Sequence, residues 1–286
     1  MQMVELAYPS RPDLRVADVA QRASELLGEP LDVQGDDASQ SVSLWHRAHP
    51  IRYADGKEAP PSTTLLHSDQ GCAPEQYAEE IQQSWATEDP AALLAGSRHS
   101  VLVTEMMASG LPPVERLRLF HGVLQAVVEA APPAGMVAKH GQQVVSSAAY
   151  LASCDAPPLQ RAGAFNVRLF RVDGSEGEVV MDTRGLDEVG LHDIQCHFRG
   201  LDPNEVAGVL RNIGAYVVDR GPVIESGHTV PGVGPGVGPG VGPGAGPDGA
   251  AEAPSWRCQF EKAIVGPERE LLDLDPGAPH AAGHRG

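Results

Sequence analysis

Six polar residues in a short stretch of the C-terminal half carry the side-chain types of a general acid–base site. They combine carboxylates, a guanidinium, an amide and an imidazole, and they are Asp182, Arg184, Asp187, Asp193, Gln195 and His197. Asp182 ends one predicted strand, and the loop after it leads to a second strand that begins near Asp193. We therefore expect these groups to converge at one edge of a sheet, where acid, imidazole and amide can act together.

Three interpretations of this cluster are open at the level of sequence. Asp193, Gln195 and His197 alternate with apolar residues, which fits a hydrogen-bonded turn followed by a solvated strand face. The same side chains also fit a binding surface. A catalytic site is the third interpretation, although the pattern assigns a catalytic role to none of the six individually.

The histidines do not indicate a metal site, although the chain has 11 of them. His192 and His197 are five residues apart on a predicted strand, so their side chains point to opposite faces. His280 and His284 lie in the C-terminal tail, where they would chelate metal only adventitiously. The sequence has no HExxH and no paired-cysteine motif. We expect no metal and no cofactor.

Motifs for nucleophilic catalysis and phosphate binding are missing as well. The sequence has no G-x-S-x-G elbow and no phosphate-cradling loop. The four cysteines, Cys72, Cys154, Cys196 and Cys258, are scattered, which is typical of reduced thiols. Cys196 lies on the predicted apolar face of its strand, so we expect a buried structural thiol there.

The chain is strongly acidic, with a formal net charge of -17 and lysine only at Lys57, Lys139 and Lys262. Phosphate backbones and anionic membranes repel such a chain, so we expect neither nucleic acid nor membrane as a partner. The first residues lack the pattern of a secretory signal, and no apolar run approaches the roughly 20 residues of a membrane span. These features predict a cytoplasmic protein.

The N-terminal region, residues 1–152, reads as an α+β subdomain. Helical spacing of apolar residues predicts a helix that Gly28 ends and a second helix after Pro112 and Pro113. A further helix from Pro74 is expected to bury one stripe of side chains, Tyr77, Ile81 and Trp85. Predicted strands cover residues 4–8, 42–45, 63–67, 100–107 and 136–145.

The C-terminal region, residues 164–276, reads as a second α+β subdomain. Predicted strands cover residues 166–172, 178–182, 191–198 and 271–274, and the turn 173–177 joins the first two. Asp202 and Pro203 have the signature of a helix start, and Gly221 ends that helix.

Three segments are predicted to lie outside these two regions or to interrupt them. The Pro- and Ala-rich residues 153–163 are predicted to be a hinge. A Gly/Pro/Val repeat predicts a disordered insertion at 231–254, within the last hairpin, because proline removes donors and glycine costs backbone entropy. Deleting residues 232–246 should then barely change the melting temperature. Residues 277–286 are predicted to be a disordered tail.

Several short segments resemble a bacterial family called domain of unknown function 4261. They are residues 166–170 (NVRLF), 181–186 (MDTRGL), 190–191 (GL), 193–196 (DIQC) and 227–229 (GHT). The resemblance is best over about residues 165–229 and extends to the strand near residues 268–273. It implies domain boundaries and no activity, since the family carries no assigned function and no catalytic residues.

The order of elements predicts an α+β protein with two apposed ferredoxin-like subdomains, each a mostly antiparallel sheet with helices on one face. For function, we predict a non-enzymatic interaction protein, an adaptor- or immunity-like partner of another bacterial protein. The alternative is a small-molecule enzyme that uses the cluster from Asp182 to His197. Alanine at either residue should leave cellular function largely intact in the first case and remove most of it in the second. The sequence indicates no oligomeric state.

Overall fold

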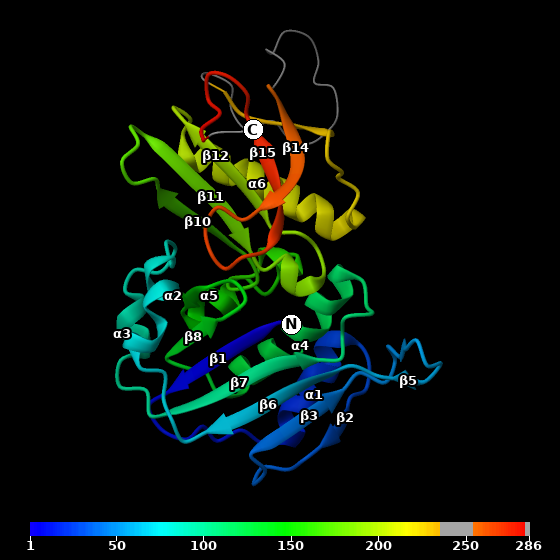
Figure 1. Cartoon of the computed structure of the whole chain (residues 1–286). Coiled ribbons are helices and arrows are strands. Elements are labelled where there is room, and N and C mark those ends of the chain that lie inside the picture. Colours follow the sequence, from blue (N-terminus) through cyan, green and yellow to red (C-terminus); the bar gives the residue numbers. More distant parts are fainter. Residues whose placement is uncertain (235–253, 284–286) are drawn as a thin grey trace. The chain divides into compact units, whose positions relative to one another are not determined.

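The computed structural model describes residues 1–234 and 254–283, which divide into two compact units (Figure 1). Unit 1 comprises Met1–Asn166 together with Glu188–Gly190, and unit 2 comprises Val167–Asp187 and the residues from Leu191 onward. Among the described residues, no helix is long and apolar enough to cross a membrane.

Unit 1 is built on a seven-stranded antiparallel sheet with the order β2-β3-β6-β7-β1-β8-β9. Its strands are β1 (Met3–Tyr8), β2 (Asp32–Gln34), β3 (Ser41–Trp45), β6 (Ser62–Ser68), β7 (His99–Met106), β8 (Gly135–Ala138) and β9 (Gln143–Val145). A separate ribbon pairs β4 (Ile51–Arg52) with β5 (Glu58–Ala59). The helical segments are α1 (Val16–Leu27), η1 (Pro74–Tyr77), α2 (Ala78–Gln82), α3 (Pro90–Leu94), α4 (Pro113–Ala130), α5 (Ser147–Ala152) and η2 (Pro158–Gln160).

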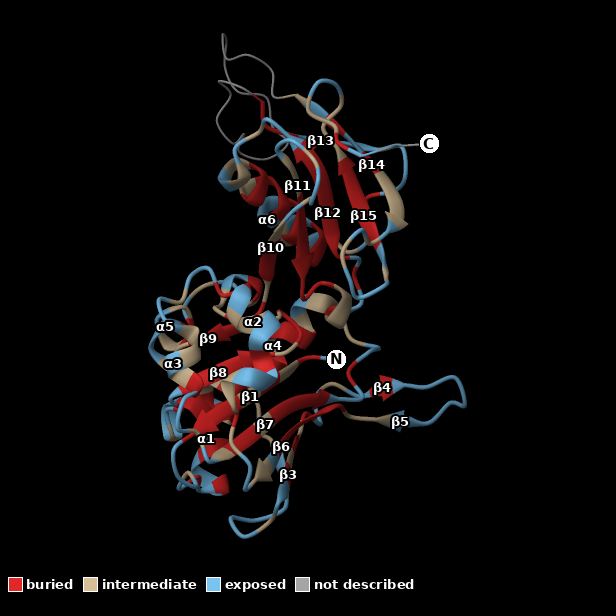
Figure 2. Ribbon diagram, turned by 60° about the vertical axis from the view of Figure 1, so that its left-hand side comes forward, coloured by how far each residue is buried: buried red, intermediate tan, exposed pale blue. Residues whose placement is uncertain are grey.

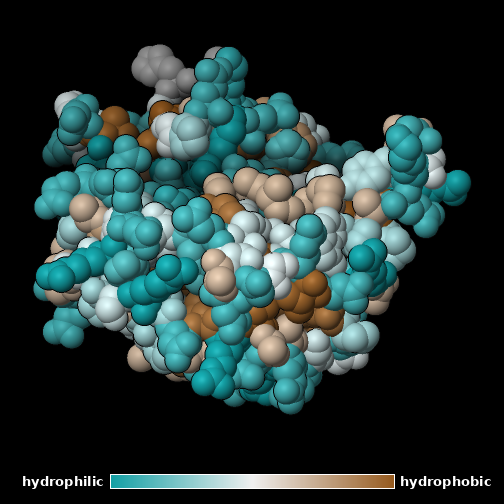
Figure 3. All heavy atoms as spheres, turned by 90° about the horizontal axis from the view of Figure 1, so that it is seen from below, coloured by the Kyte–Doolittle hydropathy of each residue, from teal (hydrophilic) through white to brown (hydrophobic). Residues whose placement is uncertain are grey.

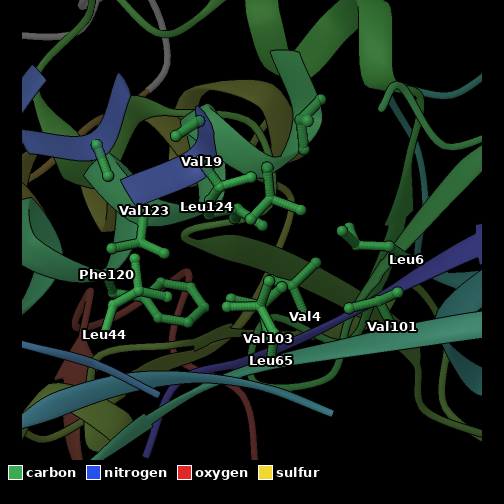
Figure 4. Packing of buried hydrophobic residues seen from close by; sticks show 14 of the residues in the cluster. Val4, Leu6, Val19, Leu44, Leu65, Val101, Val103, Phe120, Val123 and Leu124 are labelled. Atoms are coloured by element: carbon green, nitrogen blue, oxygen red, sulfur yellow. The ribbon is translucent and has the colours of Figure 1, made fainter. Parts of the chain in front are cut away.

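The main core of unit 1 lies between the sheet and the two long helices α1 and α4, which cover one face (Figure 1). Alternate residues of the strands point into it, and the apolar stripe of each helix faces them. Figure 4 shows Val4 and Leu6 of β1 opposite Phe120 and Leu124 of α4. The predicted end of α1 is confirmed, because Gly28 adopts a left-handed conformation with φ of 72°.

The other face of this sheet is covered near β8 and β9 by η1, α2 and α3. Tyr77 is buried there and Ile81 packs against the same cluster, as predicted. Trp85 differs from the prediction, because the helix ends at Gln82 and leaves the indole 64% exposed. The strand predicted over residues 136–145 is also divided into β8 and β9, which pair with each other across a turn.

Residues 153–163, predicted to be a hinge, are packed within unit 1. Cys154 belongs to the core cluster, Leu159 is buried, and η2 contacts α4. The division between the units falls after Asn166. Burial of these apolar side chains explains why the Pro- and Ala-rich composition does not produce a flexible link here.

Unit 2 contains a six-stranded sheet with the order β10-β11-β12-β15-β14-β13. Its strands are β10 (Asn166–Arg171), β11 (Glu178–Arg184), β12 (Ile194–Arg199), β13 (Thr229–Pro231), β14 (Ser255–Lys262) and β15 (Glu270–Asp275). The long α6 (Pro203–Arg220) completes it, and the short η3 (Asp187–Val189) begins at the last residue of unit 2 before Glu188–Gly190 of unit 1. The pairs β11–β12, β13–β14 and β14–β15 are antiparallel, whereas β12 and β15 are parallel because α6 lies between them in the chain.

Helix α6 begins and ends as predicted. The Asp202 carboxylate accepts a hydrogen bond from the Asn204 amide, Pro203 is the first helical residue, and Gly221 follows the last turn. Val206 and Leu210 are buried on the face that packs against β11 and β12. The predicted α+β class is confirmed for the chain, and the ferredoxin-like arrangement of each unit stays a prediction.

The Gly/Pro/Val insertion was predicted within the last hairpin, but it lies within the hairpin before it. The described residues at both ends of the insertion are packed. Val230 pairs with Trp256, so the repeat lies between β13 and β14, and the last hairpin is β14–β15. Val233 is 1% exposed, and the Gly232 amide donates to the Pro254 carbonyl at 2.7 Å. Deleting residues 232–246 would therefore remove packed residues, contrary to the expected small effect. Residues 235–253 lie outside the described part of the chain.

The predicted disordered tail is packed as far as the structure describes it, at residues 277–283. Ala281 forms a β-bridge with Phe198, and Ala282 is 2% exposed. Burial of Ala282 and the backbone bridge to Phe198 hold this segment in place, although its composition alone indicates no order. Residues 284–286 lie outside the described part.

Gly232→Ala is expected to lower the free energy of unfolding by about 1–3 kcal/mol, the usual cost of overpacking a filled site. A β-carbon at Gly232 would collide with the Trp256 indole, which is fully buried. Gly208→Ala in α6 is the matched control, because a β-carbon there meets nothing within 4 Å. That change should raise stability by about 0.5–1 kcal/mol. Urea unfolding followed by circular dichroism measures both, and equal effects would contradict the packing of Gly232 on Trp256.

Candidate functional site

The six candidate residues lie in unit 2, on or beside neighbouring strands β11 and β12. Asp182 of β11 is directly opposite Gln195 of β12, and Gln195 is paired in turn with Asp273 of β15. These side chains occupy the sheet face opposite the one that α6 covers, because Ile194 and Cys196 alternate with them. The predicted convergence is therefore present for the residues from Asp182 to Gln195, but it lies on inner strands and not at an edge of the sheet.

This polar face is buried, which contradicts the interpretation as a solvated strand face (Figure 2). Asp182, Asp193 and Gln195 have almost no exposed surface, and Asp187 is the most open of the six, with 33% of its side chain exposed. The loop 263–269 between β14 and β15 covers part of the face, since the Ile264 amide donates to Gln195 Oε1 at 3.1 Å. The alternation of residues in the sequence predicted which side chains share this face. It did not predict the loop that covers the face.

Asp182 is the centre of the cluster, because two arginines bind its carboxylate. Arg168 of β10 donates from Nε at 2.8 Å and from Nη2 at 2.6 Å, a bidentate pair. Arg269 donates from Nη2 to the same carboxylate at 2.8 Å. Arg168 also donates to the Gly266 carbonyl at 3.1 Å, which joins the covering loop to β10.

Asp193 lies next to Asp182 and shares Arg269 with it, at 3.1 Å from Nε. Its other oxygen accepts from the Thr183 hydroxyl at 3.1 Å and from the Leu186 amide at 3.2 Å. Arg184 is 3.5 Å from Asp193 and 3.4 Å from Asp187, so it bridges the two carboxylates. The turn after β11 is thus closed by side chains of the candidate cluster.

The electrostatics of Asp193 reflect this burial. Burial raises the pKa of Asp193 to about 7, the nearby Asp187 carboxylate acts in the same direction, and Arg269 and Arg184 oppose the shift. The folded pKa lies above the ordinary value of 3.8, so the folded state holds a proton that the unfolded state releases. The contribution of Asp193 to stability is therefore present at low pH and is lost as pH rises from about 4 to 7.

His197 lies apart from this carboxylate–arginine cluster. Its Nε2 is 3.2 Å from the Glu178 carboxylate, and its backbone carbonyl accepts from the Ala282 amide. The structure thus brings together five of the six predicted residues, with His197 paired further along β12. Gln195 Nε2 and Arg184 Nε have no hydrogen-bond partner among the described residues.

Sequence reasoning missed Arg168 and Arg269, the two residues that neutralise Asp182. Arg168 was within the segment NVRLF, and its place on a strand beside β11 was the available signal. Arg269 had no such signal, because it follows a loop of no regular pattern and reaches the site only when β15 pairs with β12. With both included, the cluster balances three guanidinium groups against three carboxylates, Arg168, Arg184, Arg269, Asp182, Asp187 and Asp193.

Among the described residues, no group of three or more histidine, cysteine, aspartate or glutamate side chains could hold a metal ion. The His192 ring contacts Phe260, with centroids 4.7 Å apart. All four cysteines are buried, and none of them forms a disulfide. Burial raises the pKa of Cys258 to about 11 and that of Cys72 to about 12, so both are thiols rather than nucleophilic thiolates near neutral pH.

Comparison with known families gives a match that covers most of this cluster. Residues 182–275 match the family described as Domain of unknown function (DUF4261). The resemblance seen in the sequence is confirmed over this segment. No curated protein and no solved structure matches the chain.

The DUF4261 segment contains all six candidate residues and Arg269. It begins at Asp182, within β11, and ends at the last residue of β15. Arg168 and the tail from residue 276 lie outside it. The matched segment thus contains Asp182 and Asp193 with one of the arginines that bind Asp182, while the other arginine comes from β10.

Proposed function

We propose that this chain is a non-enzymatic protein-interaction module of the cytoplasm, an adaptor- or immunity-like partner of another bacterial protein. The observation that carries the proposal is a partly apolar half of the unit 1 sheet, on which Leu66 and Met106 are exposed. The charge pairing of the candidate cluster supports it further, because those carboxylates are engaged inside the fold.

The half-sheet surface consists of the outward-facing residues of β3, β6 and β7, on the face opposite α1 and α4. Its cross-strand pairs follow from the register, with Leu66 opposite Leu102 and Ser62 opposite both Trp45 and Met106. Leu66 is 38% exposed and Met106 is 42% exposed. Between these apolar ends lie serine and threonine side chains, of which Ser43 and Thr64 hydrogen-bond to each other at 3.0 Å.

This composition suits a docking surface better than a solvated sheet face. Outward positions of an antiparallel sheet usually carry charged residues, whereas the half-sheet surface carries hydroxyl and large apolar groups. The β4–β5 ribbon extends from unit 1 (Figure 2), and Tyr53, which follows β4, is 39% exposed. On the molecular face in Figure 3, small groups of hydrophobic residues lie between hydrophilic ones.

The test is the double change Leu66→Glu and Met106→Glu, followed by affinity capture of the tagged protein from its own cells with mild crosslinking and mass spectrometry. We expect one stoichiometric partner with the natural chain and at least a tenfold loss with the double variant. Tyr216→Glu in α6, at a residue 43% exposed, is the matched control and should retain the partner. The proposal is contradicted if all three chains retain the partner. It is also contradicted if the natural chain captures no stoichiometric partner.

The alternative, a small-molecule enzyme at the Asp182–His197 cluster, is tested best at His197. Asp182 is unsuitable, because its removal would take away the carboxylate that both Arg168 and Arg269 bind, and this would disturb the fold. His197→Ala removes the side-chain pairing with Glu178. Loss of cellular function with the unfolding transition unchanged would favour the enzyme and argue against the interaction module.

A further inference from the structure

The two central parallel strands of unit 2 separate soon after they begin to pair. β12 and β15 are in register at Ile194 with Leu272 and at Gln195 with Asp273. Further along β12, Phe198 pairs instead with Ala281 of the tail, in the antiparallel direction. The chain reaches this position after Gly277, whose amide donates to the Asp275 carboxylate at 2.8 Å. The tail thus fills a slot beside the second half of β12.

Backbone hydrogen bonds hold the tail in this slot. The Arg199 amide donates to the His280 carbonyl at 2.9 Å, and the Ala282 amide donates to the His197 carbonyl at 3.2 Å. This is the pattern by which an extended peptide adds a strand to a sheet, where main-chain bonds give affinity and side-chain pockets give selectivity.

The slot selects for small residues at two successive positions. Ala282 is 2% exposed, so a larger side chain would need space that the packing does not provide. Gly283 has φ of 77°, and a β-carbon there would lie 2.6 Å from His197 Nδ1. An occupant must therefore place a small residue and then glycine beside His197.

We infer that the slot beside residues 197–199 of β12 is a binding site for an extended peptide containing a small residue followed by glycine. The chain's own tail occupies the site in cis and competes with such a peptide. The tail lies beyond the DUF4261 match, which ends at residue 275, so the matched segment includes β12 without this covering strand. The inference concerns unit 2 and is independent of the half-sheet surface of unit 1.

The experiment uses a chain that ends at Pro276 and a fluorescein-labelled peptide of residues 277–283, GAPHAAG. Fluorescence anisotropy should show saturable binding to the truncated chain. Binding to the full chain should be at least about tenfold weaker, because a tethered segment competes at an effective concentration near the millimolar range. Peptides with Ala282→Trp or Gly283→Val are the matched controls and should bind at least tenfold more weakly than the natural peptide.

A second variant keeps the inference testable if truncation harms folding. Ala282→Glu in the full chain should expel the tail and expose the slot while every residue is retained, so this chain should bind the peptide as the truncated chain does. Three results would overturn the inference. The first is absence of binding to a variant that keeps a cooperative unfolding transition. The second is equal binding of the natural and the Gly283→Val peptides. The third is a dimer of the full chain that disappears on truncation, which would mean that copies exchange tails.

Discussion

Asp182→Ala is expected to lower the free energy of unfolding by about 3–5 kcal/mol, the range for removing one partner of a buried ion pair. Arg168 and Arg269 both donate to this carboxylate, and all three side chains are buried or nearly so. Without Asp182, Arg168 would have lost its bidentate partner, and Arg269 would retain only Asp193 and carbonyl groups. Two guanidinium charges in a poorly solvated site are costly, which is why the expected effect is large.

Urea-induced unfolding measures this effect, with Asp187→Ala as the matched control. Asp187 carries the same carboxylate in the same cluster, but a third of its side chain is exposed and its contact with Arg184 is long, at 3.4 Å. Its removal should cost about 1 kcal/mol or less, as for exposed pairs. A double-mutant cycle with Arg168→Ala should give a coupling energy of about 1–3 kcal/mol for neighbouring residues. If Asp182→Ala costs no more than Asp187→Ala, the ion-pair network does not hold the sheet together.

Acid should destabilise unit 1 through His46, by about 3 kcal/mol between pH 6.5 and 4. Burial lowers the pKa of His46 to about 4, and the charges of His49 and Arg118 act in the same direction, against a weaker opposing effect of Glu115. The folded pKa lies below the ordinary value of 6.5, so the unfolded state binds the proton first. The stabilising contribution of neutral His46 is therefore complete above pH 6.5 and is lost as the pH falls towards 4.

The comparison that isolates this effect is the natural chain against His46→Gln, by urea unfolding at several pH values. His46 Nε2 contacts the Thr63 hydroxyl at 3.0 Å, and a glutamine amide preserves a polar group near it without titrating. Because other titrating groups are common to both chains, the opposite trend of Asp193 cancels in the difference. The stability advantage of the natural chain over the variant should shrink by about 3 kcal/mol from pH 7 to 4. A difference that is constant with pH would mean that His46 is accessible to protons in the folded state.

Two other buried histidines of unit 1 should add to the acid sensitivity of the natural chain. Burial lowers the pKa of both His121 and His140. His121 contacts the Tyr150 hydroxyl at 3.2 Å, and His140 contacts the Met3 carbonyl at 2.9 Å. They titrate in both chains of the comparison, so the measured difference reports His46 alone.

Elements that local sequence can specify were predicted closely. α6 has its capping aspartate, first-turn proline and terminal glycine within the segment itself, and the order of β1, α1, β3 and β6 follows from period and turn residues. β14 was not predicted, although Trp256, Cys258 and Phe260 alternate through its eight residues. Trp85 was placed in a buried stripe because the pattern does not reveal that α2 ends at Gln82.

For the candidate site, alternation in Leu191–Phe198 predicted which residues share a face, since side chains of a strand alternate regardless of what surrounds it. Whether that face is exposed to solvent or buried depends on segments that are far away in the sequence. Arg269 and the loop before it approach Asp182 only through the pairing of β15 with β12, and Arg168 approaches through β10.

The sequence by itself determined the α+β class, the start and end of the long helices, the acidic character and the resemblance to DUF4261. Each of these depends on composition, on short spacings, or on motifs within a few tens of residues. Only the tertiary structure decided that the polar cluster is a buried, charge-balanced network and that the tail lies beside β12. Those outcomes depend on contacts between residues such as Asp182 and Arg269, or Phe198 and Ala281, which lie about 80 positions apart in the chain and meet only once the sheet has formed.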